Sequence, residues 1–301
     1  ESHRKDFTGK GCIMLYIVAA MHCEAKPLIQ QFNLKRDASA RFFEIYRNED
    51  MALVVSGVGK RRAAIATSHI LSRLEPDESS AIVNIGTCGS ISKSLAVGNL
   101  VLINKIKDVE TGREYYPDML LRKIFMEQGS LDTHNEVLTR NDMVAYYKQK
   151  DRYPDFVDME ASGFFQAAER FLGPHQIYVV KVVSDYLEGN LMDKAYITDC
   201  MEKAMPDIKK LIDEILNFQG QAAKEDIFTS EDRITLEKLV SHLRLTNYQT
   251  HELYDMARAF KIRTGSKIPE FKGIMSSDIK TKEQGKKFFN QIKQILTTVR
   301  E

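Results

Sequence analysis

Continuous apolar runs alternate with amphipathic stretches from the N-terminal region to about residue 217. Runs typical of buried strands lie at 12–20, 41–47, 51–55, 81–85, 97–106, 131–138 and 176–184. Apolar residues spaced three or four apart predict helices at 24–31, 60–74, 160–172 and 200–217. Strands that alternate with helices predict an α/β domain, with a central mixed, twisted sheet flanked by helices.

The pattern changes near residues 218–230, after which only helical stripes occur. These stripes are Leu236, Leu239, Val240 and Leu243; Leu253, Met256, Ala257 and Phe260; and Phe288, Ile292, Ile295, Leu296 and Val299. We therefore expect two domains, an α/β domain at 12–218 and a small helical C-terminal region at 228–301.

The N-terminal run allows two interpretations. Arg4 and Lys5 precede the apolar run at 12–21, which imitates a secretory signal. A buried parallel strand gives the same run, and the α/β pattern that follows favours the strand. Met14 could be the natural start, in which case residues 1–13 would be a leader.

Composition excludes several classes of function. The chain has 43 Lys and Arg against 42 Asp and Glu, so its overall charge favours neither nucleic acid nor a membrane surface. No apolar run approaches the roughly 20 residues that span a bilayer. The four cysteines form no CxxC pair and the histidines do not cluster, so we expect reduced thiols, no metal and a cytoplasmic protein.

The helical tail differs in charge from the rest of the chain. The segment 258–301 holds 11 Lys and Arg against 4 Asp and Glu, a net charge of about +7. It carries no nucleic-acid-binding motif, so we do not expect nucleic acid as a partner. A helical cap on the main domain or on a partner subunit is the simpler interpretation.

Five short segments follow the predicted strands and carry candidate chemistry. In order, they are AAMHCEAKPL (19–28), SGVGK (56–60), VNIGTCGSI (83–91), VDMEASG (157–163) and VVKVVSDY (179–186). Glycines in the second and third predict tight turns that let the backbone approach a ligand. Glu24, Glu160 and Asp185 supply three carboxylates. Taken singly, these carboxylates also suit helix N-termini and turns.

Together the five segments resemble the nucleoside phosphorylase and nucleosidase superfamily over roughly 14–217. The branch they resemble most is the methylthioadenosine/S-adenosylhomocysteine nucleosidases. The resemblance implies a nucleoside phosphorylase-like catalytic domain at 12–218, no cofactor, and a role in purine nucleoside metabolism and methionine salvage. It also implies a homodimer in which a partner's loop, here 109–120, closes the site.

The resemblance assigns a role to each candidate residue. Asp185 is expected to protonate N7 of the leaving purine, and Glu24 to activate the attacking water. Glu160 is expected to accept hydrogen bonds from the ribose hydroxyls. The remaining expected substrate-binding residues are Met159, Thr87, Ser184 and Gly89. Cys88 lies among them, but we interpret it as a small buried residue.

Departures from the family pattern are informative as well. Phosphate-binding relatives carry a Gly-Asp-Pro-x-Arg pattern and a second Arg; the first is absent here and Asn84 stands at the second position. Losing both guanidinium groups favours water over phosphate as the nucleophile. Asp158 replaces the family's Glu, and Lys181 stands where an Arg is usual. The base-contacting segment is not recognisable in 131–156, where Val137 and Leu138 are candidates, and Tyr196 is a candidate aromatic over the sugar or base.

The leading hypothesis is an N-ribosyl hydrolase that releases adenine from a 5′-substituted adenosine, such as methylthioadenosine or S-adenosylhomocysteine. Carboxylates in opposite acid and base roles suit breakage of an N-glycosidic bond. One alternative is a phosphate-dependent purine nucleoside phosphorylase. Another is a non-catalytic nucleoside-binding protein, although such a protein needs no acid–base pair.

Overall fold

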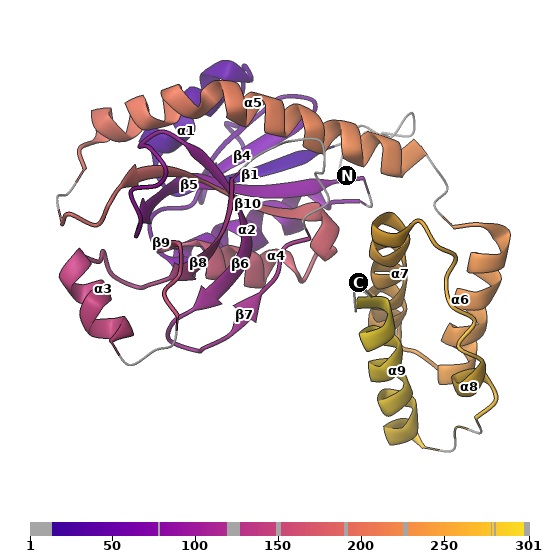
Figure 1. The fold of residues 1–301 in the computed structure, drawn as a ribbon. Coiled ribbons are helices and arrows are strands. Elements are labelled where there is room, and N and C mark those ends of the chain that lie inside the picture. Colours follow the sequence, from indigo (N-terminus) through magenta and orange to yellow (C-terminus); the bar gives the residue numbers. More distant parts are fainter. Residues whose placement is uncertain are drawn as a thin grey trace. The chain divides into compact units, whose positions relative to one another are not determined.

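The computed structural model describes residues 14–77, 79–118, 127–148, 152–189, 192–224, 228–277, 279 and 281–297. The chain divides into two compact units, Glu1–Ala223 and Lys224–Glu301 (Figure 1). The first unit contains all the described strands, and the second is helical in its described part.

The first unit is built on a single mixed sheet. Its strands are β1 (Leu15–Ala19), β2 (Lys35–Arg36), β3 (Glu44–Arg47), β4 (Met51–Val55), β5 (Ala81–Ser90), β6 (Leu100–Asp108), β7 (Glu114–Tyr115), β8 (Glu127–Thr133), β9 (Phe156–Asp158) and β10 (Ile177–Asp185). The strands β4, β1, β5 and β10 lie side by side and parallel. Their carboxyl ends therefore meet at one edge, where ligands bind in open α/β sheets.

Part of the sheet curls into a ring. Strand β10 pairs with β5 on one side and β6 on the other. Strand β6 pairs with β8, β8 with β9, and β9 returns to β5. The five pairings close a cycle, so side chains that point inward from these strands are shielded from solvent.

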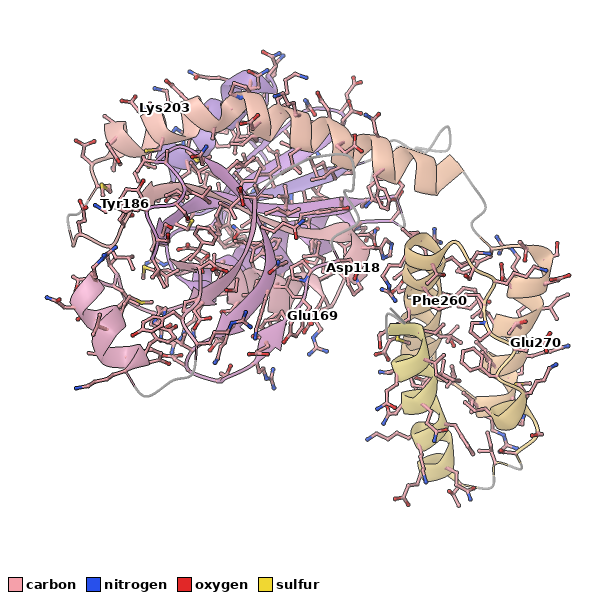
Figure 2. The ribbon with its side chains drawn as sticks, in the orientation of Figure 1. Asp118, Glu169, Tyr186, Lys203, Phe260 and Glu270 are labelled. Carbon is pink, nitrogen blue, oxygen red and sulfur yellow. The ribbon has the colours of Figure 1, made fainter. Side chains whose placement is uncertain are left out.

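Helices cover both faces of the sheet, as the alternating pattern predicted (Figure 1). They are α1 (His22–Gln31), α2 (Lys60–Leu74), α3 (Arg140–Tyr147), α4 (Ala161–Ala168), a short 3₁₀ turn (Pro174–Gln176) and α5 (Lys194–Lys224). Helices α1 and α5 share one hydrophobic core with the sheet, and α2 and α4 share the other. Side chains fill the space between the ribbons (Figure 2).

The second unit contains α6 (Ser230–Leu243), α7 (Asn247–Thr264), α8 (Lys272–Met275) and α9 (Lys282–Thr297). The predicted stripes supply much of its core, which buries Leu236, Leu239, Leu243, Leu253, Ala257, Ile292 and Leu296. Ile295, expected in the third stripe, is 46% exposed. Val299 lies outside the described residues. None of the helices that the structure describes is long and apolar enough to cross a membrane.

Several elements differ from the sequence-based expectation. The strand expected at 131–138 is β8, which ends at Thr133, and neither α3 nor β9 was expected. The GTCGS stretch was expected to be a glycine turn, but it is the second half of β5 and pairs with β10 and β9. Its glycines serve close packing instead: a Cβ on Gly89 would lie 2.4 Å from Leu187 Cδ2. Cys23, Cys88 and Cys200 are buried free thiols, while Cys12 lies outside the described residues.

Candidate active site

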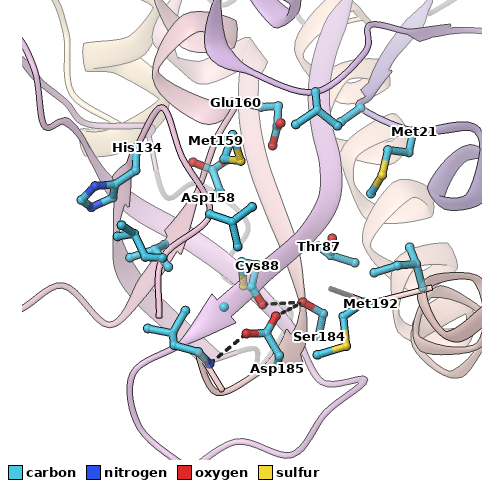
Figure 3. Close-up of a pocket in the computed structure, with 18 of the residues that line it drawn as sticks. Met21, Thr87, Cys88, His134, Asp158, Met159, Glu160, Ser184, Asp185 and Met192 are labelled. Carbon is cyan, nitrogen blue, oxygen red and sulfur yellow. Dashed lines mark hydrogen bonds between the residues drawn. The ribbon is translucent and has the colours of Figure 1, made fainter. Parts of the chain in front are cut away.

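A cavity of about 370 Å³ opens at the carboxyl-end edge of the parallel strands. All seven residues expected from the sequence line it: Glu24, Thr87, Gly89, Met159, Glu160, Ser184 and Asp185. They come from four segments that are distant in the chain. Figure 3 shows the carboxylates of Glu160 and Asp185 on opposite sides of this cavity.

Glu24 is held in a cradle of four donors. It lies in the first turn of α1 and is only 2% exposed. The amides of Ala20 and Met21 donate to its Oε2 at 3.1 and 3.0 Å. The amide and the hydroxyl of Thr87 both donate to its Oε1 at 2.8 Å. Donors from two elements fix the position of this carboxylate at the cavity wall.

The strand beside Glu24 has a glycine where a side chain would interfere. A Cβ on Gly86 would lie 3.1 Å from Glu24 Oε1. The absence of that side chain lets the carboxylate reach the Thr87 donors on β5. Thr87 therefore acts in this structure as a partner of Glu24 as well as a lining residue.

Asp185 ends β10 and is held by its neighbours in the chain. The Leu187 amide donates to its Oδ1 at 2.8 Å. The Ser184 hydroxyl lies 2.7 Å from its Oδ2 and 3.1 Å from the carbonyl oxygen of Cys88. A hydroxyl has one hydrogen, so it can donate fully to only one of these two acceptors. Ser184 thus lies between Asp185 and the adjacent strand β5, within hydrogen-bond distance of both.

Glu160 is the N-cap residue of α4 and is 7% exposed. The Gly59 amide, in the turn before α2, donates to its Oε1 at 2.8 Å. Burial raises the pKa of Glu160 to about 7, with Asp158 and then Glu24 adding to the effect and Lys181 opposing it. A perturbed carboxyl in a cavity is a common mark of a functional site.

A buried ion pair lies directly behind Glu160. Lys181 Nζ is 2.8 Å from Asp158 Oδ2, and the two side chains are 1% and 0% exposed. Asp158 also accepts from the Thr133 hydroxyl and from the Ala161 amide, each at 2.8 Å. The sequence marked both partners only as departures from a family pattern, and it did not reveal that they pair.

Three further residues were suggested by the sequence as substrate contacts; two of them line the cavity and one does not. Val137 and Leu138 line the cavity, as suggested. Tyr196 does not: its hydroxyl donates to the Ser184 carbonyl at 2.9 Å, and its neighbour Ile197 lines the cavity instead. Asn84 is buried beneath the site, where its amide donates to the Val18 carbonyl at 3.0 Å.

Sequence reasoning missed much of the apolar lining. Met21, Val58, Met192 and Ile197 line the cavity together with His134 and Glu136. Single apolar residues in turns and helix starts carry no distinctive sequence signal. Burial raises the pKa of the Cys88 thiol, which agrees with its interpretation as a small buried residue. Within the described residues, no three His, Cys, Asp or Glu side chains gather to hold a metal.

Residues 15–139 match a family model described as the phosphorylase superfamily. The α/β unit thus resembles that superfamily. The match covers the strands and turns that supply Glu24, Gly59 and Thr87.

Two curated relatives share a name. The chain is 26% identical over 199 residues to the 5′-methylthioadenosine/S-adenosylhomocysteine nucleosidase of Bacillus licheniformis, which covers 56% of this chain and 84% of the relative. It is 24% identical over 233 residues to that of Staphylococcus aureus, covering 67% of this chain and all of the relative.

Solved structures show the same fold. Arabidopsis thaliana 5′-methylthioadenosine nucleosidase superposes with a TM-score of 0.57 at 19% identity, covering 68% of this chain and 97% of that one. Helicobacter pylori futalosine hydrolase gives a TM-score of 0.55 at 15% identity, covering 67% and 98%. Both matches confirm the α/β architecture expected from the sequence.

Proposed function

We propose that this protein is a nucleosidase that hydrolyses the N-glycosidic bond of a 5′-substituted adenosine, such as methylthioadenosine or S-adenosylhomocysteine, and releases adenine. The observation that carries the proposal is the meeting of Glu24, Glu160 and Asp185 on one cavity. The names of the two curated relatives support the same reaction.

The three carboxylates divide the reaction between them. Glu24 takes a proton from a water molecule, whose oxygen bonds to C1′ of the sugar. The C1′–N9 bond breaks, its electron pair moves to the base, and Asp185 delivers a proton to N7. Each such acid or base contribution is worth roughly 10² to 10⁴ in rate. Glu160 accepts the sugar hydroxyls and favours the positive charge that develops on the ring.

Water as the nucleophile is favoured over phosphate by the residues around Glu24. A phosphate dianion needs a guanidinium or several convergent donors. The donors here, from Ala20, Met21 and Thr87, are taken up by the carboxylate of Glu24. A carboxylate in that place repels an anion, and Asn84 donates to a backbone carbonyl.

The apolar part of the cavity supports a substrate whose 5′ carbon carries a thioether. Met21, Val58, Met159, Met192 and Ile197 line it. Thioether side chains adapt to irregular apolar shapes, such as an alkylthio substituent. An unmodified 5′-hydroxyl would be buried against such a surface without a partner, which costs binding free energy.

We further propose a homodimer in the cytoplasm. The 109–120 segment, described up to residue 118, holds the exposed Tyr116. Aromatic residues are enriched on surfaces that a partner covers. The buried free thiols agree with a reducing compartment. Light scattering of the full chain tests the dimer.

The proposal is tested by a substrate panel. Pure protein is incubated in phosphate-free buffer with methylthioadenosine, adenosylhomocysteine, 5′-deoxyadenosine, adenosine and inosine, and free base is assayed. We expect the two thioether nucleosides to be cleaved most efficiently. No release of base from any of the five would overturn the proposal. Efficient cleavage of inosine alone would refute the assignment of the substrate class.

A further inference from the structure

The ion pair between Lys181 and Asp158 connects two parts of the site. Lys181 lies on β10, four residues before Asp185, and Asp158 ends β9. Strands β10 and β9 are not neighbours, since β5 pairs with both of them. The side-chain contact at 2.8 Å therefore reaches past β5 within the closed ring of strands.

Asp158 in turn holds the turn that carries Glu160. Its Oδ2 accepts from the Ala161 amide at 2.8 Å, one residue beyond Glu160. Its carbonyl oxygen accepts from the His134 amide at 2.8 Å, one residue before Met159. Both ends of the Met159–Glu160 turn are thus fixed by Asp158, and Lys181 fixes Asp158 to the strand of Asp185.

More acidic than basic side chains surround Lys181. The titratable groups that face it are Asp158 and Glu160 from the turn after β9, Glu24 from α1, and the Cys88 thiol from β5. His134 at the end of β8 approaches Asp158 through its backbone. Lys181 thus faces three carboxyl groups as a single ammonium group.

Strand register explains how Glu24 comes within range of Lys181. Lys181 pairs with Gly86 on β5, and residues in register point to the same face of a sheet. A Cβ on Gly86 would point at Glu24. Burial alone would lower the pKa of Lys181, but Asp158 and then Glu160 outweigh burial and raise it. The ammonium group therefore stays charged among the carboxyl groups.

We propose that Lys181 is a positioning residue that acts through Asp158: it fixes the turn of Glu160 relative to Asp185 and offsets the negative charge beside Glu160. The sugar-binding role of Glu160 on which this rests belongs to the proposed function. Lys181 itself makes no contact with the substrate in this account, because Asp158 lies between it and the turn.

The test compares Lys181→Met, Lys181→Arg and the double variant Lys181→Met/Asp158→Asn. For each, kcat/KM is measured between pH 6 and 9 on a riboside and on its 2′-deoxy analogue. Without the ammonium group, Glu160 should ionise at a pH higher by about one unit or more. The preference of Lys181→Met for the riboside should fall at least about fivefold at pH 7 and recover as the pH rises.

Two comparisons separate positioning from simple stability. Lys181→Arg keeps the charge and should keep the wild-type pH profile. Lys261→Met removes a lysine that pairs with the buried Asp232 in the helical unit, so it should lower stability there and leave the profile unchanged. If Lys181→Met fails to fold, the double variant removes both charges and should fold, since neutral replacement of a buried pair is well tolerated. Its preference for the riboside should fall with little change in the pH at which Glu160 ionises, because the two lost charges act on Glu160 in opposite directions.

A second readout does not depend on activity. The ¹³C shifts of the Glu side-chain carboxyls are titrated in the ligand-free wild type, in Lys181→Met and in Lys181→Arg, with Glu160→Gln identifying the Glu160 signal. An upward shift of the Glu160 midpoint on loss of Lys181, with Lys181→Arg matching the wild type, supports the proposal even if no nucleoside is cleaved. Identical Glu160 midpoints and identical pH profiles in all variants would overturn it.

Discussion

The carboxylate of Glu160 accepts a hydrogen bond from the backbone amide of Gly59 at 2.8 Å, across 101 positions of sequence. This contact joins the turn before α2 to the start of α4. Gly59 has a φ of +106°, a conformation that side-chain-bearing residues rarely adopt. Only a glycine presents its amide to Glu160 in this way, so the turn and the carboxylate form one unit.

We expect Glu160→Gln to lose most of the preference for ribosides over 2′-deoxyribosides. The neutral amide weakens two charge-assisted hydrogen bonds, each worth about 1.5–3 kcal/mol. The ratio of kcat/KM for adenosine-type and 2′-deoxyadenosine-type substrates measures the effect. An unchanged ratio would show that Glu160 does not bind the 2′-hydroxyl.

The raised pKa of Glu160 predicts proton release on binding. In the free protein its pKa is about 7, so below that pH the group is mostly neutral. A bound diol favours the carboxylate and lowers this pKa, so the proton leaves. Affinity for ribosides should then fall as pH drops below 7.

The number of protons released on binding is measured by calorimetric titration with a nucleoside, at pH 6.5 and 8.5, in two buffers of different ionisation enthalpy. The variant Asp185→Asn is used because it should bind the nucleoside without turnover. Release should be clear at pH 6.5 and small at pH 8.5. Glu160→Gln is the control, and an equal release from it would assign the proton to another group.

Asp185→Asn should lower turnover by at least about 10² while leaving nucleoside binding largely intact. The amide has nearly the same shape and still accepts from the Leu187 amide, but it has no proton to deliver to the base. Single-turnover rates and ligand titration separate the two effects. Turnover close to wild type would remove Asp185 from the mechanism.

The packing of α4 against α2 predicts a strong effect at Gly163. A Cβ there would lie 1.9 Å from the Lys60 carbonyl oxygen, which is backbone and cannot move aside cheaply. Gly163→Ala should therefore destabilise the α/β unit by about 1–3 kcal/mol or more. Gly273→Ala is the matched control, because it is also helical and nothing lies within 4 Å of its Cβ.

The measurement is the Tm of the α/β unit in thermal unfolding. The transition of this unit is recognised because a nucleoside bound in its cavity raises the Tm. A Tm within one degree or so of wild type for Gly163→Ala would contradict the close packing of these two helices.

Much of the site was predictable because its chemistry sits in short segments at strand ends. Glu24 and Asp185 each follow an apolar run, and the topology of parallel strands brings such ends together. The pairing of Lys181 with Asp158 was not predictable, since partner choice inside a ring of strands depends on tertiary packing. The strand at GTCGS was missed for a similar reason: local glycine preference predicts a turn, but pairing with β10 and β9 overrides it.

In the proposed reaction water, not phosphate, attacks the sugar. The most direct measurement follows methylthioadenosine cleavage by ³¹P NMR in phosphate buffer, with the initial rate compared against phosphate-free buffer. We expect equal rates in both buffers, with free adenine accumulating and no sugar 1-phosphate signal. Base release that requires phosphate, with one sugar 1-phosphate formed for each adenine, would contradict it.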